Sequence, residues 1–183
     1  MAPARAAGAP ARRCRGRNSP SRPTTTFMRQ VVPRWTTTDA AQLAAYQALL
    51  RRVGPAVVLA HSQGGMFATR AAQAEPALVR ALVLVEPAGF GATTPEAMAA
   101  LRVTSPSSRS MGDFIEQDGR WPAIRQRGLD FYARLRAAGG SVDAVALPER
   151  GIMGNSHMMM MDRNNRAVAQ VVQDWLAARG LWR

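Results

Sequence analysis

The sequence of 183 residues has little cysteine, little histidine and no long apolar run. Its one cysteine, Cys14, allows no internal disulfide, and two histidines, His61 and His157, leave few side chains that could hold a metal ion. No apolar stretch approaches the roughly 20 residues of a transmembrane helix. The length suffices for one domain with a core of its own, and we predict no membrane partner, metal site or other cofactor.

Lysine is absent, so all 24 basic residues are arginines. They produce a formal net charge of +12, which raises the question of nucleic-acid binding. Eight of these arginines lie in residues 1–38, where no acid occurs, and the remaining 16 stand against 12 acids. No recognition motif and no basic helical stripe accompany the charge, so we predict no nucleic-acid partner.

Large apolar residues are scarce in the first 35 positions, which are rich in Ala, Pro, Arg, Ser and Thr. Such a segment buries too little apolar surface to offset chain entropy, so we predict a disordered tail over residues 1–35 and a folded domain over 36–183. No apolar segment of a secretory signal follows Arg12 and Arg13. This favours a cytoplasmic location, although the Arg-rich, acid-free composition is also that of a transit peptide.

What the sequence does contain is an apolar strand pattern that leads directly into a helix pattern. Residues 56–60 are all apolar, lack helical periodicity and follow Gly54–Pro55, which predicts a strand buried on both faces. Residues 66–74 are rich in alanine with apolar side chains at helical spacing, and Glu75–Pro76 ends them. Only residues 61–65 join the two patterns, so the chain must turn sharply between them.

Ser62 lies in this turn, within the run Ala60-His61-Ser62-Gln63-Gly64. The run matches the nucleophile-elbow pattern G-x-S-x-G with Ala60 in place of the first glycine. Small residues at both ends let strand and helix approach each other, and the turn exposes the serine oxygen at the carboxyl end of the strand. The Gln63 main-chain N–H, at the start of the helix, would point toward a developing oxyanion. A serine–glycine turn without chemistry remains the alternative.

Helix and strand patterns also alternate along the rest of the chain. The spacing of apolar residues predicts a helix from Thr36 to Gly54, a buried strand over 81–85, a helix that opens at Trp121–Pro122, a strand over 142–147 and a last helix capped by Asn164 or Asn165. Residues 91–110, rich in Thr, Ser and Pro, predict no clear strand, although residues 111–114 could close a poor one. This alternation predicts an α/β fold of the doubly wound type, a parallel sheet covered by helices on both faces.

A serine nucleophile requires a base that takes its proton and an acid that orients the base. His157 lies between the last strand and the last helix, where a doubly wound sheet would present it at the same edge as Ser62. His61 adjoins the serine and should point elsewhere from the turn. We therefore predict His157 as the base.

Three carboxylates are candidates for the acid. Glu86 has the strongest case because it directly ends a wholly apolar strand and should be partly desolvated. Asp113, after a glycine at the end of the weak strand, is the second choice. Glu149 is followed by Arg150 and is more simply a solvated ion pair.

Three runs around these residues resemble one family. Residues 58–65, Val-Leu-Ala-His-Ser-Gln-Gly-Gly, are similar to the elbow of esterases with the α/β-hydrolase fold. Residues 84–87, Leu-Val-Glu-Pro, and residues 154–165, Gly-Asn-Ser-His-Met-Met-Met-Met-Asp-Arg-Asn-Asn, resemble a bacterial branch whose acid is a glutamate after the sixth strand. Residues 31–183 together resemble the carboxyl-terminal half of such an esterase.

This resemblance implies a serine hydrolase that cleaves small-molecule carboxylic esters through an acyl-enzyme, without a cofactor. It implies Ser62 as nucleophile, His157 as base and Glu86 as acid, while Gly112–Asp113 resembles the commoner position of the acid.

The chain departs from this family ahead of the elbow. The family builds four strands and a loop with a second oxyanion N–H there, whereas only 55 residues precede the elbow strand here. In addition, the Ser/Thr/Pro-rich residues 103–110 replace an expected apolar strand. We therefore expect an incomplete sheet and a truncated or misread reading frame that still encodes an esterase core. The opposing expectation is a non-catalytic remnant, and the oligomeric state stays open.

Overall fold

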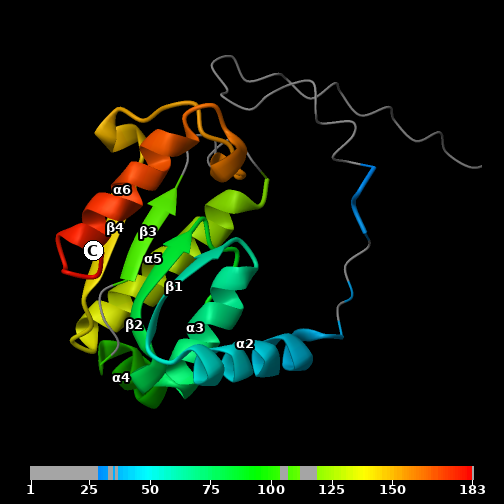
Figure 1. Cartoon of the computed structure of the whole chain (residues 1–183), viewed down its shortest axis with the longest axis vertical. Coiled ribbons are helices and arrows are strands. Elements are labelled where there is room, and N and C mark those ends of the chain that lie inside the picture. The colour runs from blue at the N-terminus through cyan, green and yellow to red at the C-terminus, as the bar shows by residue number, and fades with distance from the viewer. Residues whose placement is uncertain (1–28, 33–34, 36, 104–106, 112–118, 183) are drawn as a thin grey trace, which may run out of the picture.

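A parallel sheet with helices on both faces organises the chain (Figure 1). The computed structural model describes residues 29–32, 35, 37–103, 107–111 and 119–182. In chain order the elements are α2 (Asp39–Val53), β1 (Ala56–His61), α3 (Gly64–Ala74), η1 (Pro76–Leu78), β2 (Val79–Val85), α4 (Pro95–Val103), β3 (Ser107–Met111), α5 (Trp121–Ala137), β4 (Val142–Ala146), η3 (Pro148–Arg150), η4 (Met159–Met161) and α6 (Asn165–Ala177). The strand order is β1-β2-β3-β4, and all neighbours are parallel, so the α/β prediction is confirmed.

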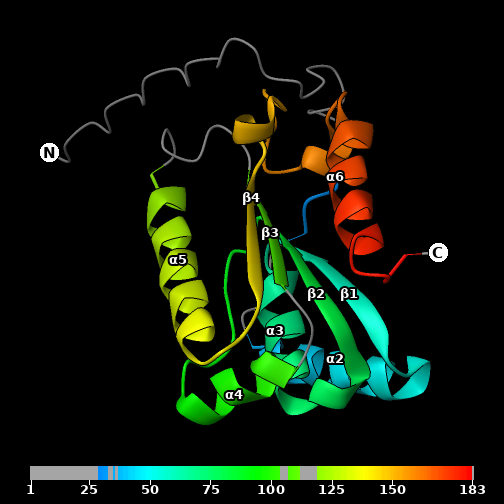
Figure 2. The ribbon, with the colours of Figure 1, turned by 90° about the vertical axis from the view of Figure 1, so that its left-hand side faces the viewer.

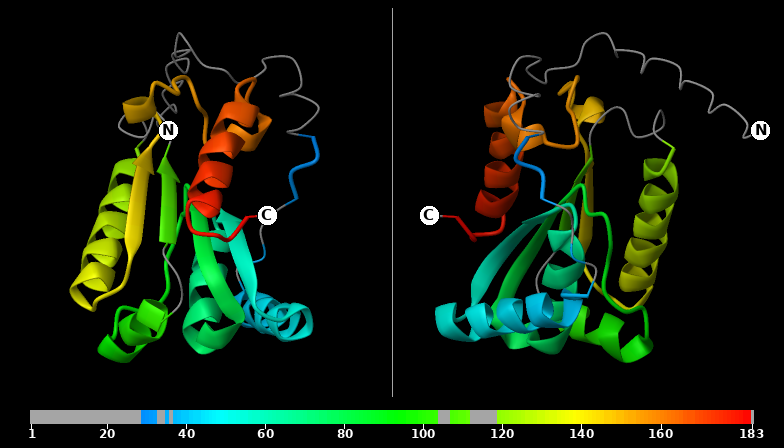
Figure 3. Two further views of the ribbon diagram at one scale, coloured as in Figure 1. Left: turned by 60° about the vertical axis from the view of Figure 1, so that its left-hand side comes forward. Right: turned by 90° about the vertical axis from the view of Figure 1, so that its right-hand side faces the viewer.

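β2 separates the two layers of the core. Its Leu82 and Leu84 are buried with side chains of α3, α4 and α5, whereas Ala81, Val83 and Val85 are buried with side chains of α6. Side chains alternate between the two faces of a strand, so a wholly apolar strand contributes buried apolar side chains to both layers of the core. Figure 2 and the right-hand panel of Figure 3 show α6 on one side of the sheet and α5 on the other.

β1 differs from the prediction of a strand buried on both faces. Ala60 is buried, but Leu59 is 58% exposed. Leu59 lies along a groove of about 340 Å³ that α6 also lines, and among the described strands β1 pairs only with β2. The apolar run therefore predicted the strand correctly and its burial wrongly, because α6 buries its apolar side chains chiefly against β2 and β4.

β3 shows that the expected absence of a strand before residue 111 was wrong. Residues 107–111 form the third strand, which pairs in parallel with β2 and β4, and residues 95–103 form α4. A strand between two others has main-chain partners on both sides, and this context outweighs the weak strand propensity of its three serines.

The predicted disordered tail falls largely outside the described residues. Its described part, residues 29–32 and 35, forms neither helix nor strand. None of the helices that the structure describes combines the length and the apolar character needed to cross a bilayer.

Candidate active site

Ser62 lies in a sharp turn between β1 and α3. Its φ of 53° falls in a region that residues other than glycine rarely adopt. Main-chain hydrogen bonds hold the turn, because the Ser62 N–H donates to the carbonyl oxygen of Val85 at 3.1 Å and the Ser62 carbonyl accepts from Gly65 at 3.1 Å and from Ala88 at 2.9 Å. The end of β2 thus fixes the backbone of the serine.

The glycine that this turn needs most is Gly65. A Cβ at position 65 would lie 2.7 Å from the Cβ of Pro87, which is too close for two carbon atoms. A Cβ on Gly64, where the sequence predicts a small residue, would lie 3.1 Å from the hydroxyl of Tyr46 and 3.8 Å from the Cβ of Ala60. The sequence pattern asked for small residues at positions 60 and 64 and did not single out Gly65.

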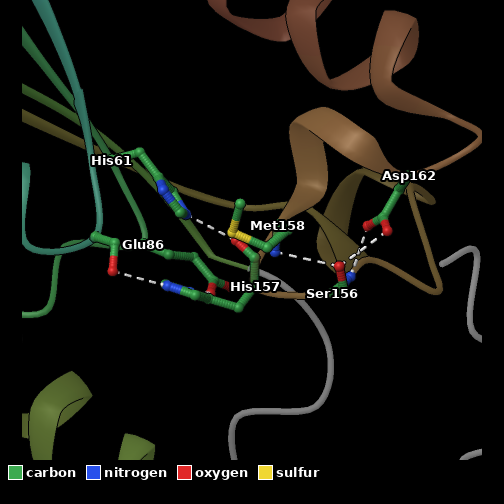
Figure 4. Close-up of polar contacts among 7 residues, drawn as sticks. His61, Glu86, Ser156, His157, Met158 and Asp162 are labelled. Carbon is green, nitrogen blue, oxygen red and sulfur yellow. Dashed lines mark hydrogen bonds and ion pairs between the residues drawn. The ribbon is translucent and has the colours of Figure 1, made fainter. Parts of the chain in front are cut away.

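The structure brings the predicted nucleophile, base and acid together. His157 Nε2 lies 2.8 Å from Ser62 Oγ. On the other side of the ring, His157 Nδ1 lies 2.6 Å from Glu86 Oε2 (Figure 4). A carboxylate only accepts hydrogen bonds, so Nδ1 carries the hydrogen and Nε2 is left to accept the serine proton. The Glu86 side chain is 4% exposed and that of His157 30%, which leaves the imidazole within reach of a substrate.

The other predicted candidates lie elsewhere. Asp113 falls outside the described residues, and Glu149 is exposed in η3. Gln63 occupies the N-cap position of α3, so its main-chain N–H lies at the amino end of that helix, as predicted. Among the residues that the structure describes, no three His, Cys, Asp or Glu side chains gather into a group that could hold a metal.

A buried carboxylate holds the loop on both sides of His157. Asp162 is 1% exposed and accepts hydrogen bonds from the main-chain N–H of Ser156 at 2.7 Å and from its hydroxyl at 2.9 Å (Figure 4). The Ser156 hydroxyl in turn accepts from the Met158 N–H at 3.2 Å. Both neighbours of His157 are therefore anchored to Asp162.

Asn155 and Asn164 close the same loop. Their side-chain amides exchange two hydrogen bonds, of 2.9 and 3.1 Å. Asn164 stands in the N-cap position of α6, but its side chain makes no capping hydrogen bond, so the predicted cap is wrong in its chemistry. The Asn164 side chain thus has the amide of Asn155 as its hydrogen-bond partner, in place of a main-chain N–H at the start of α6.

Two aromatic rings contact His157. Trp121, the first residue of α5, has its ring centroid 4.4 Å from that of His157, and the His61 ring lies at 4.6 Å. Sequence reasoning gave neither residue a role at the base, because nothing in the spacing links α5 or the end of β1 to the loop after β4.

His61 turns its Nε2 toward the loop. This nitrogen lies 2.8 Å from the main-chain carbonyl oxygen of His157. Partial burial lowers the pKa of His61 below its ordinary value of 6.5, and the neighbouring His157 ring adds to this, while the hydrogen bond to the carbonyl opposes it. His61 is therefore neutral near pH 7.

Comparison with known proteins decides the family. The model of the Alpha/beta hydrolase family matches residues 1–183. The chain belongs to this family. The α/β-hydrolase fold implied by the sequence is thereby confirmed.

Two relatives of this α/β hydrolase carry descriptive names. A solved structure of a novel bacterial esterase superposes with a TM-score of 0.82 and 32% identity, over 92% of this chain and 53% of that one. The probable secreted lipase phiG of a fungal species is 28% identical over 182 residues, covering 75% of this chain and 50% of the relative. The chain thus spans about half the length of both relatives.

Proposed function

We propose that this α/β hydrolase cleaves carboxylic esters through a covalent acyl-enzyme on Ser62. The observation that carries the proposal is the continuous chain of hydrogen bonds from Ser62 Oγ through His157 to Glu86, with distances of 2.8 and 2.6 Å. This is the arrangement of nucleophile, base and orienting acid that acyl transfer requires. The names of the two relatives, an esterase and a lipase, support an ester as the substrate.

Acylation begins when Ser62 Oγ attacks the ester carbonyl carbon and His157 Nε2 takes the hydroxyl proton. Glu86 accepts the Nδ1–H hydrogen bond and stabilises the imidazolium that forms. The carbonyl oxygen becomes an oxyanion, and the Gln63 N–H at the amino end of α3 donates to it. The tetrahedral intermediate then breaks its bond to the alcohol oxygen, which leaves with the proton from Nε2.

Deacylation repeats these steps with water. His157 Nε2 removes a proton from a water molecule as its oxygen attacks the acyl carbon of the Ser62 ester. The second tetrahedral intermediate releases the carboxylic acid, and the proton on Nε2 returns to Ser62 Oγ. No step requires a metal or an organic cofactor.

The second candidate is a non-catalytic relative of such enzymes. It is favoured by the single oxyanion donor that we assign among the described residues. Gln63 is the one oxyanion donor that we assign, and removing one such donor typically lowers kcat about 10²- to 10³-fold. A protein of this kind would keep the fold around Ser62 without turning over an ester.

A fluorophosphonate probe separates the two candidates, because it reacts only with an activated serine. We expect stoichiometric labelling of the wild-type protein, and hydrolysis of p-nitrophenyl acetate that falls on the order of 10⁶-fold in Ser62→Ala. Ser141→Ala, at an exposed serine between α5 and β4, is the matched control and should keep both activities. Folded wild-type protein that takes up no label, or label that persists in Ser62→Ala, would refute the proposal.

A further inference from the structure

His61 links the serine turn to the loop of the base through a bond that the proposed reaction does not use. It is the last residue of β1 and directly precedes Ser62, and its Nε2 lies 2.8 Å from the main-chain oxygen of His157 (Figure 4). A carbonyl oxygen only accepts, so Nε2 must carry a hydrogen and donate it. In the neutral ring, Nδ1 is then without a hydrogen.

This bond joins two segments that are 96 residues apart in the sequence. Ser62 is fixed by β1 and β2, whereas His157 stands in a loop. The hydrogen bonds that Ser156 donates to Asp162 anchor that loop only to itself. The His61 bond anchors it from the side of the sheet, at the main chain of His157 itself. The distance between serine and imidazole is therefore held by the backbone as well as by the bond between their side chains.

We propose that His61 is a positioning residue, which holds the main chain of His157 where its Nε2 meets Ser62 Oγ. This inference rests on the proposed function, in which His157 is the base. It assigns His61 no contact with substrate.

We call the His61 side chain and its hydrogen bond to the His157 carbonyl the tether. The charge of the tether matters because the base becomes positive during the reaction. The titratable groups that face His61 are the His157 ring, at 4.6 Å between centroids, and Glu86. The residues of α6 that share its groove, Asn165 and Gln173, are uncharged. A positive tether would repel the imidazolium on His157. Burial, which keeps His61 neutral, provides a donor without that repulsion.

The kinetic test compares two substitutions at position 61. His61→Gln keeps a neutral N–H donor near the place of Nε2, whereas His61→Met keeps the volume and removes the donor. We expect kcat for ester hydrolysis and the fluorophosphonate labelling rate to fall about tenfold in His61→Met, the effect of one net hydrogen bond, with KM nearly unchanged. His61→Gln should restore both to within about threefold.

Leu59→Ala is the matched control, because Leu59 lies on the same strand and lines the same groove as His61. We expect it to behave as the wild-type protein. Equal rates for His61→Met and the wild-type protein would overturn the inference, and so would a His61→Gln as slow as His61→Met, because packing of the ring would then be the cause.

A measurement without turnover separates failure of this inference from failure of the proposed function. The chain has two histidines, so ¹⁵N ring spectra contain two sets of signals, and His61→Gln assigns them. We expect His61 as the neutral Nε2–H form, titrating below 6.5. The low-field Nδ1–H proton of His157 should persist in His61→Gln and broaden in His61→Met.

These spectra decide the role of His61 even if the protein hydrolyses no ester. An Nδ1–H form of His61 would show that the tether is not formed, and a charged His61 ring at pH 7 would show that the tether is not neutral. A His157 Nδ1–H signal that is equally sharp in His61→Met and in the wild-type protein would show that the tether does not position the ring.

Discussion

Two residues with unusual backbones stand on either side of the base. Ser62 and Glu86 have φ angles of 53° and 41°, and each directly follows a strand, since His61 and Val85 are register partners at the ends of β1 and β2. Such conformations cost free energy, on the order of 1–3 kcal/mol each, and persist where surrounding contacts hold them. Here the Ser62 N–H donates to the Val85 carbonyl, so one contact supports both turns. Backbone strain of this kind concentrates at functional sites.

Glu86→Gln tests which carboxylate orients the base. We expect kcat to fall about 10⁴-fold, because the amide NH2 group can donate to Nδ1 and so favour the wrong tautomer of the imidazole, and because a neutral amide does not stabilise the imidazolium. Asp113→Asn, at the competing candidate, should keep the wild-type rate. Steady-state hydrolysis of p-nitrophenyl acetate measures both variants, with thermal unfolding to show that they are folded. A larger loss in Asp113→Asn would transfer the role to that residue.

Gly65→Ala tests the close approach of α3 to the turn after β2. The new Cβ would meet Pro87 Cβ at 2.7 Å, so the helix or the turn must move, and overpacking of this kind costs about 1–3 kcal/mol of unfolding free energy. Gly119→Ala, where a Cβ would meet nothing within 4 Å, is the control. Urea unfolding should place the midpoint of Gly65→Ala clearly below that of Gly119→Ala. Equal midpoints would show that the contact is easily relieved.

At the scale of elements, apolar patterns predicted β1, β2, α5, β4 and α6 close to their observed bounds. They failed at β3, whose strand depends on hydrogen bonds to β2 and β4 that no pattern within residues 107–111 encodes. They failed also on the burial of Leu59, because burial of an edge residue depends on which helices cover it.

The candidate site divides in the same way. Ser62, Glu86 and His157 could be brought together from the sequence because each follows a strand, and parallel strands place such positions at one edge of the sheet. Asp162 and Trp121 could not, because their contacts depend on how the loop after β4 folds back and where α5 begins. The roles of Asp162 and Trp121 stay predictions, as do those of Ser62, Glu86 and His157.

Asp162→Asn tests the loop that carries His157. Both carboxylate oxygens accept a hydrogen bond from Ser156, and the substitution replaces one of them with an amide NH2 group, which donates and cannot accept. We therefore expect a loss of about 1–3 kcal/mol in unfolding free energy. Hydrolysis should also slow, because the neighbours of His157 lose their anchor. Asp174→Asn is the control, since Asp174 is exposed on α6 and accepts only a local bond from Gln170 among those we describe. Equal unfolding free energies would deny the loop network its structural role.

At the scale of the whole molecule, exposed apolar side chains gather between β1 and α6. Leu59, Met160 and Trp182 are 58, 43 and 53% exposed, and all three line the groove of about 340 Å³. Within the described sheet β1 is an edge strand, so main-chain hydrogen-bonding groups adjoin this apolar surface. Exposed edges and apolar patches of this kind favour association with another chain.

We therefore expect the protein to self-associate as its concentration rises, through the groove between β1 and α6. The double substitution Leu59→Thr with Met160→Gln keeps strand and loop propensity while it removes two apolar contacts, each worth about 1.5–3 kcal/mol when fully buried, so association should weaken by at least about tenfold. Salt should strengthen association of the wild-type protein, because it screens the repulsion between molecules of net charge +12.

Leu129→Gln is the control for this prediction. It removes an apolar side chain that is 36% exposed on α5, on the other side of the sheet from α6 (Figure 2), and should leave association unchanged. Sedimentation velocity over a range of concentrations measures these effects, and equal association of the double variant and the wild-type protein would place the contact elsewhere.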